Sequence, residues 1–488
     1  MKKRFLILTY VLTFSVSFLF LQSCSGPSLE ERNASEAHSS LIQSDKTIVA
    51  FGHVTVLDIL NKMDYTSNSK TQVLIGGIVD QWKAGIDLSK PFYVSAAAPI
   101  AQDGSPETMH VIMDVKDAKK MDDVLAEMGY ALEKEGDLKY FQDNDVTFGM
   151  IHKLLVIIIK KNEYDGKKEL LATIEKMSGD LSEGKTKTII DTKADIVTGI
   201  NFERLFATSN TSLKNLSEGK KKELEETIAD SYLQTAIKFE TGQLSIESKH
   251  LFSDKFQKRL FFKDNNGTSL TSKLKGSPWM AGAANLDVLK IESFLKDFAP
   301  DAMKKITGKM PREVGFGLMA LGDNPLSKLF NGQFAYSVYG QPEVGKQPVF
   351  MTYVGYGKQG QIIGEMANSS LKDPKMASNP LLPQVQSSKS AMVLTSKGFS
   401  EANSFKAPGF APNFGKNTAS FYLDFKQVNW EAYELKDAQK VIATFDYLTV
   451  DANKSGSKVI LKSKETNKNI LKSMFDFYAD MMMEKMGM

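Results

Sequence analysis

The chain has 488 residues, of which 42% are hydrophobic and 24% charged, a composition that is ordinary for globular proteins and excludes a disordered or fibrous chain. At about 150 residues per domain, this length predicts two large domains or three smaller ones. The formal net charge of +3 falls to zero once the first 23 residues, which carry Lys2, Lys3 and Arg4 but no acid, are removed. Charge therefore gives no reason to expect nucleic acid as a partner. The single Cys excludes an intrachain disulfide and a multi-Cys zinc site.

The first 23 residues have the pattern of a lipoprotein signal peptide. The basic residues 2–4 precede an apolar stretch at 5–21, and Gln22, Ser23 and Cys24 follow. This order is typical of a secretory signal, and a Cys directly after the cleavage site resembles a bacterial lipobox. We therefore expect acylation of Cys24, palmitate included, because several acyl chains on one residue give stable membrane attachment. An ordinary signal peptide and an uncleaved anchor are the alternatives, although about 17 apolar residues are short for a spanning helix.

The segment at 24–44 is polar and rich in Ser and Glu, which predicts a flexible tether between the membrane and the folded body. Ser25 stands directly after Cys24, so the Asp that marks inner-membrane retention in enteric bacteria is absent. We expect a lipid-anchored protein of the cell envelope, at the outer membrane rather than the inner membrane.

The folded body is predicted from strand and helix patterns that follow one another in two halves. The first half contains a strand-then-helix unit at 47–63, a strand that starts at 91, strands at 109–115, 138–141, 147–151, 154–160 and 243–248, a strand-led segment at 195–205, and helices at 118–128, 168–177 and 220–237. The second half contains a strand-then-helix unit at 279–295, strands at 333–339, 349–354, 390–396 and 458–464, a strand-led segment at 420–428, and a helix at 361–368.

The second half repeats the order of the first. Residues 288–291 match the apolar spacing of residues 56–59. The continuous apolar strand at 154–160, which predicts burial on both faces, has its counterpart at 390–396. Each half has about 200 residues or more, which is enough to bury a core of its own.

We therefore predict an α+β fold of two tandem, duplicated domains at 45–270 and 276–488, each a mostly antiparallel sheet with helices packed on one face. The segment at 265–278 carries Gly, Ser and Pro and is the expected joint. A helix at 470–482 has an apolar face, which would pack on the second domain or bind a partner. One large irregular α+β domain is the alternative to the duplication.

The best match to a functional motif is Gly355–Gly360, a GxGxxG sequence between a predicted strand and a predicted helix. Such glycines let a backbone approach a pyrophosphate at a helix N-terminus. The acidic residue expected about 20 positions later is missing, and the equivalent turn of the first half, at 115–117, has no glycine. We therefore predict a tight strand-to-helix turn and no bound cofactor.

No metal site is predicted. Residues 451–456 match the first six positions of a calcium loop, but Lys462 occupies the twelfth position, where a Glu is needed. A hairpin turn is the favoured interpretation, because Asn and Gly adopt the positive φ of such turns. The five histidines share no spacing typical of metal ligands; they are His38, His53, His110, His152 and His250.

No catalytic residue is predicted either. The sequence contains none of the known motifs that surround a nucleophilic Ser. Acylation would block the thiol of Cys24, so that it could not act as a nucleophile. We therefore expect a protein without enzymatic activity.

The sequence Gly85–Tyr93, GIDLSKPFY, stands out beside the lipobox and the strand-then-helix unit IVAFGHVTVLDILNKM at 48–63. Together they resemble a Bacteroidetes lipoprotein family, known as the family of domain of unknown function 4836. The resemblance implies a lipobox followed by a long α+β body over most of residues 24–488. It brings no activity and no site residue.

These observations favour a lipid-anchored envelope protein with a non-enzymatic binding or scaffolding role. Its expected partners are the membrane, through acylated Cys24, and an envelope protein, with no nucleic acid. One alternative is a lipoprotein that binds a small molecule or glycan in a groove between the domains. Another is an enzyme whose catalytic residues are dispersed in the sequence.

Overall fold

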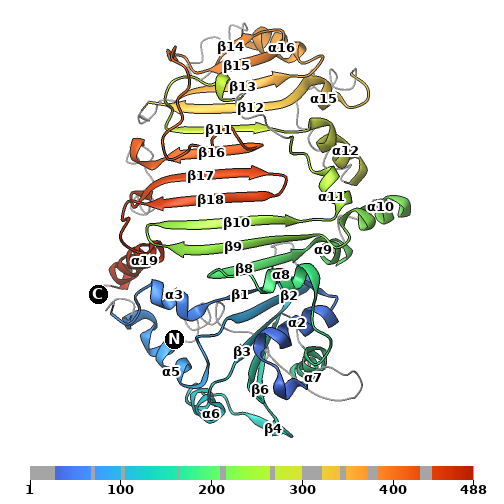
Figure 1. Cartoon of the computed structure of the whole chain (residues 1–488), viewed down its shortest axis with the longest axis vertical. Coiled ribbons are helices and arrows are strands. Elements are labelled where there is room, and N and C mark those ends of the chain that lie inside the picture. The colour runs from blue at the N-terminus through green and yellow to red at the C-terminus, as the bar shows by residue number, and fades with distance from the viewer. Residues whose placement is uncertain are drawn as a thin grey trace. The chain divides into compact units, whose positions relative to one another are not determined.

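The structure is a computed structural model (Figure 1), and it describes residues 28–67, 72–100, 105–143, 145–161, 164–208, 216–263, 270–298, 321–340, 348–371, 383–428 and 442–486. The chain divides into two compact units. Unit 1 consists of Met1–Lys214, Ile228–Glu240 and Leu471–Met488, and unit 2 consists of Asn215–Thr227 and Thr241–Ile470. The predicted α+β class with a large antiparallel sheet is confirmed.

Unit 1 is built on an antiparallel array of strands. Their bounds are β1 (Ile48–Val54), β2 (Phe92–Ile100), β3 (Pro106–Asp114), β4 (Glu133–Glu135), β5 (Leu138–Gln142), β6 (Val146–Ile151), β7 (Leu154–Lys160), β8 (Ile196–Asn201) and β9 (Tyr232–Glu240). Neighbours pair in the order β4-β5-β6-β7-β3-β2-β1-β8-β9. The helices are η1 (Leu29–Glu31), α2 (Ala34–Ser44), α3 (Val56–Lys62), η2 (Gln72–Gly76), α5 (Gly77–Gly85), α6 (Ala118–Glu127), α7 (Gly166–Met177), α8 (Gly184–Ile190), α9 (Phe202–Thr208) and α19 (Ile470–Met486).

The strand β7 lies inside this array, between β3 and β6. Its sequence LLVIIIK is apolar at almost every position, and residues 154–158 are buried. Apolar side chains on both faces need cover on both faces, so the predicted burial of this strand is confirmed.

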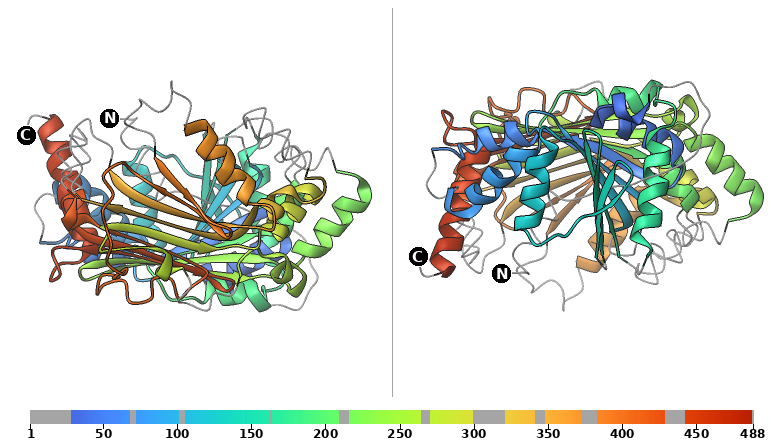
Figure 2. Two further views of the ribbon diagram at one scale, coloured as in Figure 1. Left: turned by 90° about the horizontal axis from the view of Figure 1, so that it is seen from above. Right: turned by 90° about the horizontal axis from the view of Figure 1, so that it is seen from below.

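Three helices of unit 1 cover the same face of the strands. α2 packs on β2 and β3, α7 on β5 and β6, and α8 on β1 and β8 (Figure 2). Phe51 lies beside α8, and Thr147 lies beside α7. Cross-strand pairs connect Phe51 to Thr147 through Ser95, His110 and Ile158. Because paired residues point to the same side of a sheet, Phe51 and Thr147 belong to one face. This face carries the buried polar residues from which the candidate site is built.

The predicted tether at 24–44 is wrong for residues 28–44, which are folded. Leu41 of α2 is fully buried, as are the polar side chains of His38 and Ser40. The polar composition is misleading because these side chains turn toward the strands and α7 instead of toward water.

Unit 2 is built on a second antiparallel array. Its strands are β10 (Gln243–Leu251), β11 (Met280–Asn285), β12 (Phe330–Tyr339), β13 (Val349–Tyr356), β14 (Gln384–Ser387), β15 (Ala391–Thr395), β16 (Ala419–Asp424), β17 (Phe445–Asn453) and β18 (Gly456–Ser463). They pair in the order β14-β15-β13-β12-β11-β16-β17-β18-β10. The helices are α10 (Glu218–Ile228), α11 (Asp254–Arg259), η3 (Thr271–Lys273), α12 (Val288–Phe298), α15 (Pro325–Leu329), α16 (Gln361–Leu371) and η4 (Phe425–Gln427).

The order of strands around β11 matches the order around β1. The series β6-β7-β3-β2-β1-β8-β9 of unit 1 corresponds to β14-β15-β13-β12-β11-β16-β17 of unit 2. β15 therefore occupies the same place as β7. It is less buried than β7, since Val393 and Leu394 are only half-buried.

Irregular segments cover one face of the unit 2 strands, where the sequence predicts helices. The buried cluster there consists of Leu270, Leu274, Ala281, Ala283, Ala335, Tyr353, Ala391, Ala411, Phe414 and Tyr422. The alanines on the strands leave room for the rings of Phe414 and Tyr422, which lie 5.1 Å apart. Leu270 and Leu274 come from the predicted joint at 265–278, so part of this segment belongs to the core.

The compact units depart from the predicted boundary near residue 270. β10 and most of α10 belong to unit 2, since β10 pairs with β18 and Lys220 of α10 forms an ion pair with Asp297 of α12. α19 belongs to unit 1 from Leu471 onward, where Lys472 lies 3.3 Å from Asp64. Its predicted packing on the second domain is therefore wrong.

One predicted helix is in part a strand. The sequence predicts a helix at 220–237, but α10 ends at Ile228 and β9 begins at Tyr232. In β9 every second residue from Tyr232 to Ala236 is buried. This period of two is typical of a strand and outweighs the helical propensity of the segment.

Candidate functional site

Arg32 fixes the start of the described chain to unit 1. Its guanidinium is buried and donates to the carbonyl oxygens of Met177 and Gly179, each at 2.7 Å, and to the hydroxyl of Ser40. Met177 is the last residue of α7, and carbonyl groups at a helix C-terminus have no partner within the helix. A charged donor makes stronger hydrogen bonds than a neutral one, so Arg32 holds α2 against α7.

Asn33 begins α2 with a capping box. Its Oδ1 accepts from the N–H of Glu36 at 3.0 Å, and the Glu36 carboxylate accepts from the N–H of Asn33 at 3.1 Å. Asp114 of β3 accepts from the N–H of Ala34 at 3.1 Å. The N–H groups at a helix start need such partners, and here they are supplied both locally and by the sheet.

Three histidines lie close together under α2. His38 projects from α2, His53 from β1 and His110 from β3, and they are 0%, 5% and 2% exposed. The ring of Tyr93 on β2 lies 5.5 Å from the His38 ring and 5.8 Å from the His53 ring. The hydroxyl of Ser95 lies 3.4 Å from Nδ1 of His110. Four separate elements bring these residues together.

Burial keeps these histidines neutral. It lowers the pKa of His38 to about 3 and that of His53 and of His110 to about 4. His110 lowers the pKa of His38 further, while the Val94 backbone opposes this shift. Both ring nitrogens of His38 and Nδ1 of His53 are buried without a well-formed hydrogen bond among the described residues. Imidazoles whose pKa lies this far below neutrality are poorly suited to general acid–base catalysis near pH 7.

A pocket of about 540 Å³ lies beside His53 on unit 1. It is lined by Ser35, His53, Thr55, Asp58, Lys62, Pro91, Tyr93, Ile190, Asp191, Thr192, Lys193, Ala194, Asp195, Lys238 and Glu240. Lys62 and Asp195 form an ion pair in this lining, and the second carboxylate oxygen of Asp195 accepts from the N–H of Phe239 at 2.6 Å. Asp195 is therefore already neutralised and hydrogen-bonded.

This arrangement suits a small polar molecule better than a metal ion. Within the part of the chain that the structure describes, no three His, Cys, Asp or Glu side chains are placed to hold a metal. The pocket wall instead offers the hydroxyls of Ser35, Thr55 and Tyr93 and charges of both signs. Hydroxyls both donate and accept hydrogen bonds, as the hydroxyls of a sugar do.

The glycine-rich loop Gly355–Gly360 packs against α15. A Cβ atom on Gly357 would lie 2.5 Å from the carbonyl oxygen of Lys328. The N–H of Gly357 donates to Leu329 at 2.9 Å, and the N–H of Gln359 donates to Lys328 at 2.8 Å. Two of the N–H groups that would face a pyrophosphate are thus bonded to α15, and the N–H of Gly360 donates to Gly357 within the loop. The loop forms the strand-to-helix turn that the sequence favours.

The calcium-like segment at 451–456 forms the turn between β17 and β18, as predicted. Oδ1 of Asn453 accepts from the N–H of Ser455 at 2.8 Å and from its hydroxyl at 2.7 Å. Asp451 accepts from the hydroxyl of Ser420 at 2.9 Å. The contacts of Asn453 stabilise the hairpin, and the contact of Asp451 joins β17 to β16.

His152 and His250 do not belong to the buried group of histidines. Cys24, the predicted lipidation residue, lies outside the described residues. His152 is in the turn between β6 and β7, with a φ of 50°. His250 is in β10, and its Nδ1 lies 2.9 Å from the carbonyl oxygen of Lys454.

The Gly85–Tyr93 segment, which carries the family resemblance, shapes a close contact between α5 and α6. A Cβ atom on Gly85 would lie 2.8 Å from the Cα of Met121. The Gly85 carbonyl accepts from the N–H groups of Lys116 and Asp117 at 2.8 and 3.1 Å. The segment therefore has a packing role in this chain.

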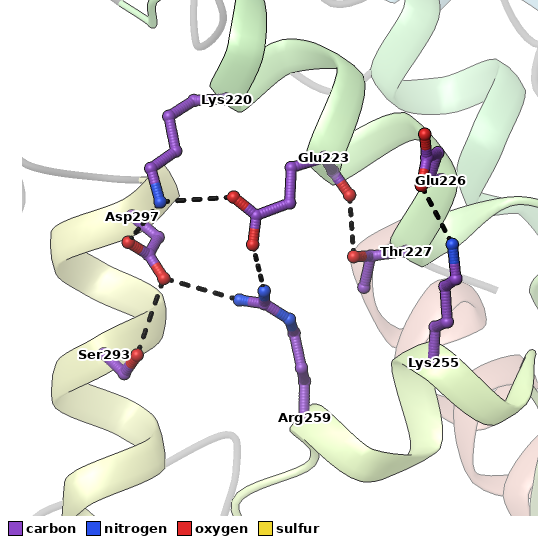
Figure 3. Close-up of polar contacts among 8 residues, drawn as sticks. All are labelled: Lys220, Glu223, Glu226, Thr227, Lys255, Arg259, Ser293 and Asp297. Atoms are coloured by element: carbon purple, nitrogen blue, oxygen red, sulfur yellow. Dashed lines mark hydrogen bonds and ion pairs between the residues drawn. The ribbon is translucent and has the colours of Figure 1, made fainter.

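An ion-pair network joins three helices of unit 2 (Figure 3). Asp297 of α12 accepts from Lys220 of α10 at 2.7 Å and from Arg259 of α11 at 3.5 Å. Glu223 of α10 accepts from the same two cations, and Arg259 lies 5.0 Å from the ring centroid of Phe298. Two acids balance two cations, so the network serves to hold the helices together.

Sequence reasoning misses Arg32 and His38 because it assigns their segment to a tether. A signal is present, since Asn33 and Glu36 have the spacing of a capping box and the apolar pair Leu41-Ile42 follows. The grouping of the three histidines has no comparable signal, because it depends on the packing of distant elements.

No helix within the described ranges is long and apolar enough to cross a membrane. Among solved structures, crystal form I of TP0453 has a TM-score of 0.27 and 5% identity over 43% of this chain and 78% of that chain. Crystal form III of TP0453 has a TM-score of 0.28 and 8% identity over 44% and 80%. The β chain of DNA polymerase III from Streptococcus pneumoniae TIGR4 has a TM-score of 0.10 and 9% identity over 85% and 100%. Similarities this weak carry no argument about this chain, and neither a family model nor a curated protein matches it.

Proposed function

We propose that this protein is a lipid-anchored member of the cell envelope, attached through acylated Cys24 at the outer membrane rather than the inner membrane. Its body would bind or scaffold an envelope protein without enzymatic activity. The proposal includes membership of the Bacteroidetes lipoprotein family that Gly85–Tyr93 resembles.

One observation carries the proposal. The described chain is folded at Leu29, five positions after Cys24, where the side chain is buried, and Arg32 ties this segment to α7. An acyl anchor requires a Cys directly after the signal peptide, and a folded unit so close to Cys24 would be held near the membrane by it. The polar surface of this start would remain in water while the acyl chains enter the bilayer.

Replacing Cys24 by Ser tests the anchor. The Cys24→Ser protein should leave the membrane fraction and lose incorporation of radioactive palmitate, because the acyl chains supply nearly all of the membrane affinity. Ser25→Ala is the matched control, since it keeps the thiol and should keep both properties. A Cys24→Ser protein that still sediments with membranes after a carbonate wash would refute the lipoprotein proposal.

A binding role is favoured over catalysis by the state of the polar residues. Burial keeps the histidines neutral, and Asp195 is paired with Lys62. Cross-linking in cells followed by identification of the linked envelope protein tests this role. Hydrolytic or transfer activity of the purified protein that disappears with a Lys62→Ala substitution would support an enzyme instead.

Binding of a small polar molecule is the second candidate, and the pocket beside His53 favours it. Its hydroxyls and mixed charges fit a neutral glycan better than an apolar ligand. Calorimetric titration with envelope-derived oligosaccharides, compared between the native protein and a Thr55→Val variant, tests this candidate. Equal heats for the two proteins would remove it.

The duplication is proposed as the origin of the two halves. The corresponding strand orders around β1 and β11 support it, as do the equivalent places of β7 and β15. An experimental structure in which these two sets of strands fail to superpose would refute the duplication.

A further inference from the structure

We infer that one surface of unit 1, formed around Ser28 by Glu30, Glu31 and Lys153, lies against the headgroup layer of the membrane that carries the anchor. This inference rests on the proposed acylation of Cys24. Unit 1 would then have a fixed orientation toward the bilayer, whereas a long flexible tether would let it rotate freely.

The short length of chain between Cys24 and Ser28 limits the distance between these two residues. Ser28 is four positions after Cys24, and an extended chain spans at most about 3.6 Å per position. Cys24 therefore lies within about 15 Å of Ser28, whatever path the chain takes. An acylated Cys24 is held at the membrane interface, so Ser28 must stay close to that interface too.

Ser28 is itself attached to the fold. Its carbonyl accepts from the N–H of Glu31 at 3.0 Å, and the neighbouring Leu29 is 6% exposed. Arg32 then binds the end of α7 through Met177 and Gly179. Freeing this segment to serve as a longer tether would expose Leu29 and leave buried carbonyl groups without a donor, which is unfavourable.

Residues from other parts of unit 1 share this surface with Ser28. Glu30, Glu31 and Asn33 line a hollow together with Arg32, Asp114 and Lys153. Lys153 lies in the turn between β6 and β7, far from Ser28 in the sequence, and it is exposed. The turn between these strands therefore shares the surface from which the anchor emerges.

The character of this surface decides how it meets the bilayer. Ser28, Glu30, Glu31, Asn33 and Lys153 are exposed and polar, and none of the exposed large hydrophobic residues of the described chain belongs to this hollow. Polar and charged side chains remain among headgroups and water, because hydrocarbon offers them no partners. Unit 1 thus rests on the membrane without entering it.

Two lysines at opposite ends of β7 provide the test. Lys153 precedes the strand and Lys161 follows it, and both are exposed. At about 3.3 Å per residue, the eight positions from Lys153 to Lys161 correspond to about 26 Å. Because Cys24 is the single Cys of the chain, a Cys introduced at either position is the sole free thiol of the acylated protein.

The acylated Lys153→Cys and Lys161→Cys proteins are labelled with a fluorophore. They are then placed in vesicles of phosphatidylethanolamine and phosphatidylglycerol that contain a headgroup nitroxide lipid. The label at 153 should be quenched several-fold more strongly than the label at 161. Equal quenching, or stronger quenching at 161, overturns the inference while leaving the lipid anchor intact.

A variant with a longer tether provides the second part of the experiment. A flexible Gly–Ser insertion between Ser25 and Gly26 should keep the protein on the vesicles and abolish the difference between the two labels. A difference that survives the insertion means that the short spacing is not its cause, and overturns the inference. Failure of the uninserted protein to sediment with vesicles overturns the proposed acylation, and the inference with it.

Discussion

Ile246 and Val459 face each other across the ladder of β10 and β18, and each is the fourth residue of its strand. Because the pairing is antiparallel, equal positions meet at one point and the two strands are related locally by a two-fold axis through this pair. Identical surfaces that meet in this way are the hallmark of isologous association. Here the relation exists within a single chain.

The pair should contribute a measurable coupling to stability. Ile246→Ala and Val459→Ala should each destabilise the protein by about 1 kcal/mol, because both side chains are half-buried. Directly opposed apolar side chains interact, so the double variant should deviate from additivity by about 0.5 kcal/mol in urea unfolding. Ile460→Ala, on the other face of β18, is the control for Ile246 and should show additivity. Zero coupling between Ile246 and Val459 would contradict the pairing.

Arg32 should be needed for docking of α2. In Arg32→Ala the carbonyl groups of Met177 and Gly179 lose a charged donor, which should cost about 3 kcal/mol. Hydrogen exchange should show loss of protection in α2 before the strands lose theirs. Lys46→Ala, an exposed cation shortly after the same helix, should leave both measurements unchanged. Full protection of α2 in Arg32→Ala would rule out this role.

The buried histidines should make the protein sensitive to acid. Their folded pKa values of about 3 to 4 lie below the ordinary 6.5, so the unfolded chain binds more protons than the folded chain between these values. Stability is therefore fully present above pH 6.5 and decreases as the pH falls. Each histidine contributes about 1.4 kcal/mol per pH unit in this range.

His38→Phe tests this dependence. The variant should lose about 1.4 kcal/mol per pH unit of the slope between pH 6.5 and 4, measured by urea unfolding at several pH values. His152→Asn changes a histidine outside the buried group and should keep the slope of the native protein. Equal slopes for the native protein and His38→Phe would show that His38 takes no part.

Gly357 should tolerate no side chain. In Gly357→Ala the new Cβ would meet the carbonyl oxygen of Lys328 at 2.5 Å, and the required shift should cost about 2 kcal/mol or more. Gly409→Ala places its Cβ in open space and should change stability by about 0.5 kcal/mol or less. Thermal unfolding of the two variants compares them. Calorimetric titration of the native protein with NAD should give no binding heat, and micromolar binding would reopen the nucleotide interpretation.

Strongly patterned elements could be predicted from the sequence. The apolar run of β7 and the strand-then-helix change at 47–63 fall where the sequence predicts them. Burial on one or both faces produces a recognisable spacing of apolar residues in the sequence. β9 is less clearly patterned, because its buried positions include the polar Gln234 while the apolar Leu233 is only half-buried. The prediction therefore extended the helix of residues 218–228 beyond Ile228. The prediction of a tether at 28–44 was wrong because the segment is rich in Ser, which is typical of a solvated chain, although several of its polar side chains are buried.

The candidate site could not be predicted. His38, His53 and His110 meet only because α2 packs on β2 and β3, and no short-range spacing records a contact between distant elements. The same holds for the pocket beside His53, whose wall combines residues of β1 and the segment after α8. Motifs with a recognisable spacing, such as Gly355–Gly360, turned out to serve local packing.

If the protein is exported as proposed, the contact of Arg32 with Met177 would also set an order of events during export. These residues are 145 positions apart in the chain, so the acceptors of Arg32 would leave the translocation channel long after Arg32 itself. Until α7 has emerged, α2 would have no helix to pack on. The peptidase and acyltransferases of the proposed lipobox would therefore meet a chain on which α2 has not yet packed against α7.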